Sequence, residues 1–226
     1  DQNFFNDTRF CMQAADCAVV LIDAVDGIKV QTEQAWEFAK EFDMPCIIFI
    51  NKLDRERADF KKAFEDAREV FDPKPILVQL PIGSEASFKG LVDLARAKAF
   101  FYDETGKASA GEIPDDLKDA VESEHEAFIE NVAEADDELV ERYLEGETLS
   151  DADIQTALRN GIMNRIFVPV LCGSATSNIG IDQLLDFVVG ALPSPADRGA
   201  FSGVDPKNGE TVERLPDPGK PFAGLV

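Results

Sequence analysis

The chain has 226 residues, of which 45% are hydrophobic and 29% are charged, as is ordinary for a globular protein with a sizeable core. No apolar run approaches the roughly 20 residues that span a bilayer, and the first residues lack the basic start and apolar core of a secretory signal. The formal charge is −22, and residues 112–153 hold 17 Asp and Glu against 2 Lys and Arg. Such a surface repels phosphate backbones, so we expect no direct nucleic-acid patch and no membrane contact. It is either a solvated acidic face or a docking surface for a basic protein.

The cysteines and the single histidine show no metal-ligand or redox spacing. Cys11 and Cys17 are too far apart for a C-x-x-C motif, and Cys46 and Cys172 lie in apolar runs. The pattern predicts buried, reduced thiols in a cytoplasmic protein. His125 lies among glutamates, where we expect a solvated side chain. We therefore predict no metal site in this chain.

The first 75 residues alternate between helical and strand patterns. Two short runs of bulky apolar residues, 17–23 and 46–50, are each bounded by polar residues, which is typical of buried strands of a parallel sheet. The helix between them is predicted from about residue 31 to 42, with Thr32 as its cap. Together they form a strand–helix–strand unit of the length that a parallel crossover requires. Further helices are predicted over 4–15 and about 58–71.

The rest of the chain changes pattern and then returns to it. Short strands, expected to be antiparallel, are predicted within 76–102, followed by a polar loop over 103–112. Three helices with apolar stripes and acidic outer faces follow, the third opened by a capping box at Ser150–Asp153. The α/β pattern then resumes with a strand over 166–172 and a helix over 181–192. Residues 194–219 are predicted as an extended linker, and 220–226 as the first strand of a truncated β-barrel domain.

Three polar residues stand directly after the apolar run 46–50: Asn51, Lys52 and Asp54. In open α/β sheets, ligands lie beyond the carboxyl ends of the strands. The two oxygens of the Asp54 carboxylate can accept two parallel N–H donors, which guanine offers on its Watson–Crick edge and adenine does not. The Asn51 amide can donate to the guanine acceptors O6 or N7, and the apolar stem of Lys52 can lie over a base plane. The sequence therefore predicts a guanine-binding loop, with a solvated strand end as the alternative.

A second strand end, at Gly173, Ser174 and Ala175, belongs to the same predicted sheet. About 120 residues separate it from Asp54, and one helix and one strand fill only roughly 30 to 40 of them. We therefore predict an α/β fold: a partial P-loop-NTPase-type parallel sheet with helices on both faces, plus an inserted α+β subdomain. The predicted domains are 1–75 with 165–193, the acidic insert 76–164, and the segment 194–226.

With both strand ends identified, the chain resembles the GTPase domain of elongation factor G, the translational translocase. Asn51-Lys52-Leu53-Asp54 is similar to the guanine-specificity motif of this family, and Gly173-Ser174-Ala175 to its second base-reading loop. Other similar stretches are Gln31-Thr32-Glu33, Pro81-Ile82-Gly83-Ser84, Phe88-Lys89-Gly90-Leu91-Val92-Asp93, Tyr143-Leu144-Glu145-Gly146-Glu147 and Ala191-Leu192-Pro193-Ser194-Pro195.

The resemblance implies that the backbone amides near Ser174 and Ala175 meet the guanine O6 and that the cofactor is GTP or GDP. The phosphate-binding pattern G-x-x-x-x-G-K-[ST] does not occur in the sequence. We expect that pattern, the first switch and the Mg²⁺ ligands to lie before Asp1 in a longer GTPase, so that this fragment alone is inactive. No catalytic residue is expected in the fragment itself. Asp1 is aligned by the resemblance with the family's catalytic histidine, which predicts slow or differently activated hydrolysis.

The resemblance also implies partners. We expect the ribosome as the main partner, and a ribosomal stalk protein as a candidate partner of the acidic insert. Two alternatives remain open at this point. One is a release-factor-type translational GTPase, and the other is an acidic protein-interaction module that does not hydrolyse GTP.

Overall fold

The computed structural model describes residues 5–220. Asp1 and nearly all of the strand predicted over 220–226 lie outside them. The chain forms two units, residues 1–192 and 193–226, which are described separately below.

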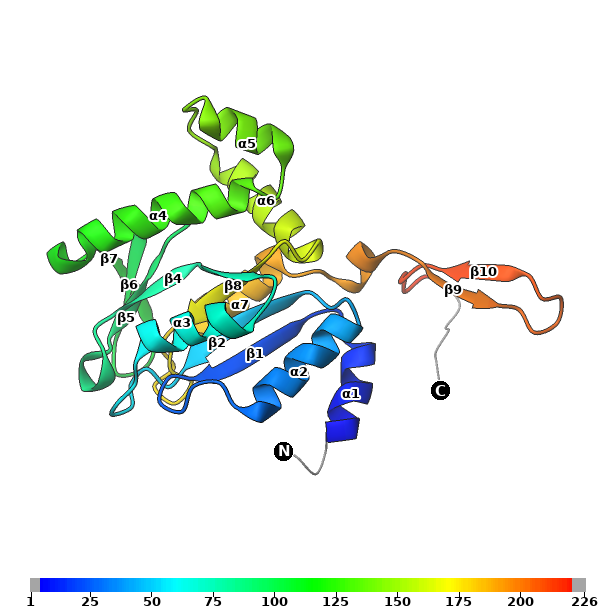
Figure 1. Cartoon of the computed structure of the whole chain (residues 1–226), viewed down its shortest axis with the longest axis horizontal. Helices are drawn as coiled ribbons and strands as arrows, with labels where there is room; N and C mark the ends of the chain where they lie inside the picture. Colours follow the sequence, from blue (N-terminus) through cyan, green and yellow to red (C-terminus); the bar gives the residue numbers. More distant parts are fainter. Residues whose placement is uncertain (1–4, 221–226) are drawn as a thin grey trace. The chain divides into compact units, whose positions relative to one another are not determined.

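The first unit is built on a parallel sheet of four strands in the order β1-β2-β8-β3 (Figure 1). The strands are β1 (Ala18–Asp23), β2 (Cys46–Asn51), β3 (Lys74–Leu77) and β8 (Phe167–Cys172). Every neighbouring pair is parallel, so all four carboxyl ends meet at one edge. The apolar runs of β2 and β8 explain why these two strands occupy the centre, because every residue in them except Asn51 is buried. The predicted α/β class is confirmed.

Four helices accompany this sheet: α1 (Phe5–Ala14), α2 (Val30–Glu41), α3 (Phe60–Val70) and α7 (Ile181–Ala191). Figure 1 shows α2 and α3 lying along the sheet. The helix α2 begins slightly earlier than we predicted, at Val30, with Lys29 as its N-cap residue. Thr32 stands at the third helical position, and its hydroxyl accepts a 3.4 Å hydrogen bond from the Lys29 amide. The prediction of Thr32 as the cap was therefore wrong, although its hydroxyl does satisfy a free amide at the helix start.

The strand β1 is less buried than its apolar sequence predicts. Val20 and Ile22 are buried, whereas Val19 is 40% exposed and Leu21 is 58% exposed. Successive side chains of a strand point to opposite faces, so one face of β1 is covered and the other is open among the described residues. The prediction of a strand buried on both faces was wrong for β1 and right for β2.

A second sheet of four antiparallel strands follows β3 in the chain. Its order is β4-β5-β6-β7, with bounds Gln79–Ile82, Gly90–Asp93, Lys98–Tyr102 and Ala108–Gly111, and the 3₁₀ helix η2 (Glu85–Ser87) links β4 to β5. Two expectations need correction. Ile76 and Leu77 belong to β3 and pair with β8 rather than lying in the insert. The loop predicted over 103–112 contains β7, which pairs with β6.

The acidic segment forms the three predicted helices, α4 (Lys118–Ala133), α5 (Asp137–Leu144) and α6 (Asp151–Met163), after the short 3₁₀ helix η3 (Asp115–Leu117). The capping box of α6 is confirmed, because the Ser150 hydroxyl accepts from the Asp153 amide and the Asp153 carboxylate accepts from the Ser150 amide. His125 on α4 is half-buried, with Nδ1 2.6 Å from the carbonyl oxygen of Leu94. It joins α4 to the residue after β5, so the prediction of a solvated histidine was wrong.

The second unit contains a β-hairpin where we predicted an extended linker. After the 3₁₀ helix η4 (Pro195–Arg198), β9 (Phe201–Val204) pairs antiparallel with β10 (Thr211–Arg214). The turn between them contains Asn208 and Gly209, and Gly209 has φ 73°, a conformation that glycine adopts without steric cost. The linker prediction was therefore wrong for residues 201–214.

Candidate functional site

Two loops follow the central strands at the carboxyl edge of the parallel sheet. We call residues 51–57 the first loop and residues 173–180 the second loop. The Leu53 amide donates to the Gly173 carbonyl at 3.3 Å, and the Gly173 amide donates to the Ile50 carbonyl at 3.0 Å. The structure thus brings together the two stretches that the sequence analysis singled out, although about 120 residues separate them in the chain.

Asn51 is the side chain that joins the two loops. Its Oδ1 accepts a hydrogen bond from the Lys52 amide at 2.8 Å and one from the Ala175 amide at 3.0 Å. With Oδ1 used in this way, the Nδ2 group has no acceptor among the described residues and can donate to a ligand. Asn51 is therefore placed both to hold the loops together and to offer one donor at the sheet edge.

Lys52 turns the chain out of β2. Its φ of 68° lies in the left-handed region, which a residue with a side chain adopts only where the surrounding structure demands it. Its ammonium group forms a salt bridge with the Asp23 carboxylate, at the end of the neighbouring strand β1. Partial burial raises the pKa of Asp23, but hydrogen bonds from Lys52 and from the amides of Val25 and Asp26 outweigh it, and the net pKa is lowered.

Asp54 has one engaged oxygen and one free oxygen. Its Oδ2 accepts a 3.1 Å hydrogen bond from the Ser177 hydroxyl of the second loop. Its Oδ1 is buried and has no hydrogen-bond partner among the described residues. Burial raises the pKa of Asp54, but the hydroxyls of Ser174 and Ser177 lower it more, so the net pKa lies below its ordinary value. The carboxylate is thus ionised at neutral pH, and its free oxygen can accept a donor from a ligand.

The backbone amides of the second loop already have partners. The Ser174 amide donates to the Ile179 carbonyl at 2.9 Å, and the Ala175 amide donates to the Asn51 side chain. The resemblance placed these amides on a guanine O6, and such a contact would have to share or exchange one of these hydrogen bonds. Ser174 is fully buried, so its hydroxyl supports the Asp54 carboxylate from within the fold.

The second loop depends on its first glycine. A Cβ atom at Gly173 would lie 2.4 Å from the Ile179 carbonyl oxygen and 2.8 Å from the ring of Phe49 in β2. Both distances are too short for any side chain. The close approach of the second loop to β2 therefore requires glycine at this position.

Sequence reasoning missed two residues of the site. Asp23 holds Lys52, and Ser177 holds Asp54. Asp23 could have been found, because it ends a strand at the same sheet edge as Asn51. Ser177 stands in no motif that was used, and only the fold brings it to Asp54.

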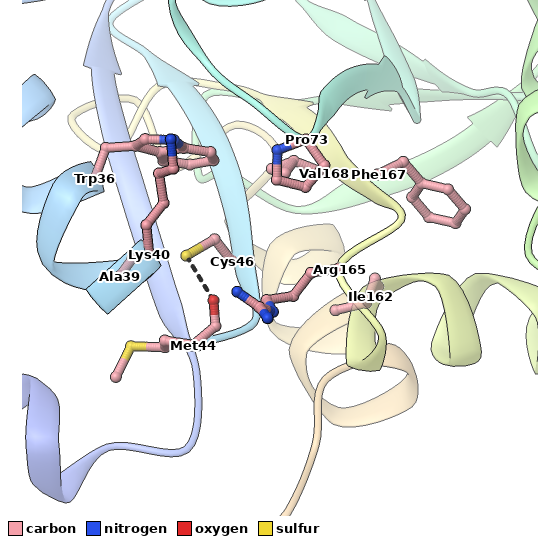
Figure 2. Close-up of a pocket in the computed structure, with 10 residues that line it drawn as sticks. All are labelled: Trp36, Ala39, Lys40, Met44, Cys46, Pro73, Ile162, Arg165, Phe167 and Val168. Carbon is pink, nitrogen blue, oxygen red and sulfur yellow. Dashed lines mark hydrogen bonds between the residues drawn. The ribbon is translucent and has the colours of Figure 1, made fainter. Parts of the chain in front are cut away.

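A separate pocket lies at the other end of β2, around Cys46 (Figure 2). The Cys46 thiol donates to the Met44 carbonyl at 3.4 Å, and burial raises its pKa to about 12. Cys172 is also buried, but Cys17 is half-buried and Cys11 is exposed, so the prediction of buried thiols was right for two of the four. Among residues 5–220, no cluster of three or more His, Cys, Asp or Glu side chains could hold a metal ion. None of the described helices combines the length and the apolar character that crossing a membrane needs.

A parallel sheet with an antiparallel insert and two polar loops at its carboxyl edge is the fold of a translational GTPase domain. Residues 1–194 match the family model described as the elongation factor Tu GTP binding domain, and the chain belongs to this family.

Elongation factors G are among its relatives. The chain is 40% identical over 226 residues to elongation factor G of Thermotoga petrophila, covering 99% of this chain and 32% of that protein. It is 39% identical to elongation factor G of Thermotoga maritima, of which it covers 33%. The chain thus spans about a third of the length of these relatives.

A solved structure has the same fold. The match is a crystal structure of a Thermus thermophilus protein titled only ttk003000868, with a TM-score of 0.81 and 30% sequence identity. It covers 94% of this chain and 33% of the other. The resemblance inferred from the two loops is therefore confirmed at the level of the family and the fold.

Proposed function

We propose that this chain is part of an elongation factor G-like translation factor, and that it carries the guanine-reading half of a GTP- and GDP-binding site. The guanine-binding residues in this proposal are Asn51, Lys52, Asp54, Gly173, Ser174 and Ala175. The observation that carries it is the Asp54 carboxylate, which has one oxygen fixed by Ser177 and one buried oxygen without a partner among the described residues. Such an acceptor fits the N1–H and 2-amino donors of guanine.

The full-length protein would hydrolyse GTP on the ribosome in a translocation-type step and work in the cytoplasm. Phosphate and Mg²⁺ would be held by residues outside this chain, because the described residues offer no metal cluster and the sequence has no phosphate-binding loop. The chain on its own would then bind nucleotide weakly and not hydrolyse it. A role of Asp1 in slowing hydrolysis belongs to this proposal and concerns a residue that the structure does not describe.

We also propose a division of the chain into a GTPase part and an insert. The GTPase part comprises residues 1–75 and 165–193, with β3 completing its sheet, and the insert comprises the antiparallel sheet and the acidic helices up to residue 164. The strong negative charge of helices α4 to α6 suits a basic protein partner such as a ribosomal stalk protein. A release-factor-type GTPase is the alternative within the class, and an acidic module without hydrolysis is the alternative outside it.

The test is a calorimetric titration of GDP and of ADP into the full-length protein that contains this chain. We expect GDP to bind and ADP not to bind, because adenine places an acceptor where guanine places a donor. The Asp54→Asn variant should lose roughly 1–3 kcal/mol or more of GDP binding energy, since the amide presents a donor to a donor. The matched control is Glu56→Gln, because Glu56 is exposed and makes no side-chain hydrogen bond among the described residues. Equal binding of GDP and ADP would contradict the proposal and favour the interaction module.

A further inference from the structure

Side chains and backbone of the antiparallel sheet region touch both loops of the guanine site. Glu85, in the turn between β4 and β5, contacts the first loop, and Tyr102, at the end of β6, contacts the residues that follow the second loop. We propose that Glu85 and Tyr102 are positioning residues for guanine recognition, Glu85 for the loop that carries Asp54 and Tyr102 for the second loop. This inference rests on the proposed function and assigns to the insert a part in nucleotide affinity.

Glu85 holds the first loop on both sides of Asp54. Its backbone amide donates to the Leu53 carbonyl at 2.9 Å, and its carboxylate Oε1 accepts from the Arg57 amide at 2.7 Å. Leu53 is buried, so the near end of the loop is already anchored, whereas Arg57 is exposed and has a left-handed φ of 67°. The Glu85 carboxylate is thus the contact that fixes the far end of the loop.

The turn that presents Glu85 is itself rigid. Gly83 has φ 81°, and a Cβ atom there would lie 2.1 Å from the Ser87 carbonyl oxygen. The Ser87 hydroxyl donates to the Ser84 carbonyl at 2.7 Å and accepts from the Ser84 amide at 3.1 Å. The buried ring of Phe88 secures the end of the turn. A load on β4 or β5 would therefore be transmitted to the first loop rather than absorbed in the turn.

Tyr102 reaches the second loop from another strand of the same sheet. Its hydroxyl donates to the carboxylate of Asp182, in the first turn of α7 directly after the second loop. Burial, and then this carboxylate, raise the pKa of Tyr102 above its ordinary range, so the hydroxyl keeps its proton. Gly106, in the loop after β6, lies so close to the second loop that a Cβ atom on it would be 2.6 Å from Nδ2 of Asn178. The second loop is thus supported by the insert at two points.

The two residues should affect different parts of guanine recognition. Asp54, in the loop that Glu85 holds, would accept from the 2-amino group of guanine, which inosine nucleotides lack. The second loop, which Tyr102 holds, would meet O6, which guanine and hypoxanthine share. Loosening the first loop should therefore reduce the preference for GDP over IDP, whereas loosening the second loop should weaken both nucleotides to the same extent.

The experiment measures the dissociation constants of GDP and IDP for the full-length protein and its variants. For Glu85→Ala, we expect GDP binding to weaken roughly threefold to tenfold, the size of one lost hydrogen bond, and the GDP-to-IDP preference to shrink. Glu85→Gln should restore both, because the amide keeps an acceptor oxygen for the Arg57 amide. For Tyr102→Phe, we expect both nucleotides to weaken by a similar factor.

Two exposed or unpartnered positions of the insert serve as controls. Glu112 is exposed and makes no side-chain hydrogen bond among the described residues, and the Tyr143 hydroxyl has no described partner either. Glu112→Ala and Tyr143→Phe should leave GDP and IDP binding unchanged. If the wild-type protein binds GDP but Glu85→Ala and Tyr102→Phe bind it equally well, the inference is overturned and the proposed function stands. If the wild-type protein prefers no guanine nucleotide, both are overturned.

Discussion

The two loops at the sheet edge are built on opposite principles. The first loop presents side chains: Asn51, Lys52 and Asp54 leave the strand in a left-handed turn, and an ion pair and hydroxyl donors hold their polar groups. The second loop presents backbone, and its shape depends on a glycine that allows contact with β2. A chemical change should therefore damage the first loop selectively, whereas a steric change should damage the second.

The largest effect is expected from a steric change in the second loop. Gly173→Ala places a Cβ atom against the Ile179 carbonyl and the Phe49 ring. We expect a loss of about 1–3 kcal/mol in the free energy of unfolding, as for other overpacked interiors, together with weaker nucleotide binding. Chemical denaturation followed by circular dichroism measures the first effect, and a GDP titration measures the second.

Gly190→Ala is the matched control. A Cβ atom at Gly190, in helix α7, meets no atom within 4 Å. Alanine there should raise the free energy of unfolding by roughly 0.5–1 kcal/mol, because glycine is a poor helix former. Equal stability losses for the two variants would show that the second loop does not depend on close contact.

A smaller effect is expected where the loops join. Asn51→Ala removes the acceptor of the Lys52 and Ala175 amides, at a cost of about 1–3 kcal/mol in unfolding free energy. Asn51→Asp keeps an acceptor oxygen for both amides and replaces the donor that could face the base. We therefore expect the Asp variant to retain most of the stability and to lose GDP affinity, as measured by denaturation and titration. A stable Asp variant with unchanged affinity would contradict the donor role of Asn51.

The sequence predicted those parts of the fold and site that depend on local pattern. The buried runs of β2 and β8, the acidic helices and the Ser150 capping box were visible because periodicity and capping are local properties. The polar residues after β2 were visible because such residues rarely follow a buried strand without a reason. Their chemistry alone left a solvated strand end open, and the second strand end and the family resemblance strengthened the guanine interpretation.

The misses share a different cause. The strand β7 consists of small residues with low β-propensity, and only its pairing with β6 makes it a strand. The hairpin of β9 and β10 did carry a signal, because Asn208-Gly209 is a typical hairpin turn, but the surrounding Gly, Pro and Asp residues suggested a linker. Glu85, Tyr102 and Ser177 contact the site region only through the tertiary fold, which no local pattern records.

The smallest effect concerns the hydroxyl of Ser177. Since the pKa of Asp54 is lowered in the folded state, ionised Asp54 stabilises the fold above its unfolded pKa of about 3.9, and this contribution is lost as pH falls through the folded pKa. Ser177→Ala removes a donor to that carboxylate, so its melting temperature should lie slightly below that of the wild type at pH 7. The difference should shrink as the pH is lowered below about 3.9. Ser177→Thr keeps the hydroxyl and serves as the control, and a difference that does not change with pH would contradict the assignment.

The most direct test of the central claim exchanges the base that Asp54 would read. Xanthine carries a carbonyl oxygen where guanine carries the 2-amino group, so an amide donor at position 54 would suit xanthine as a carboxylate suits guanine. We predict that the full-length Asp54→Asn variant loses GDP binding and gains XDP binding in parallel titrations. A variant that loses GDP without gaining XDP would contradict base reading by Asp54, and so would one that keeps its GDP affinity.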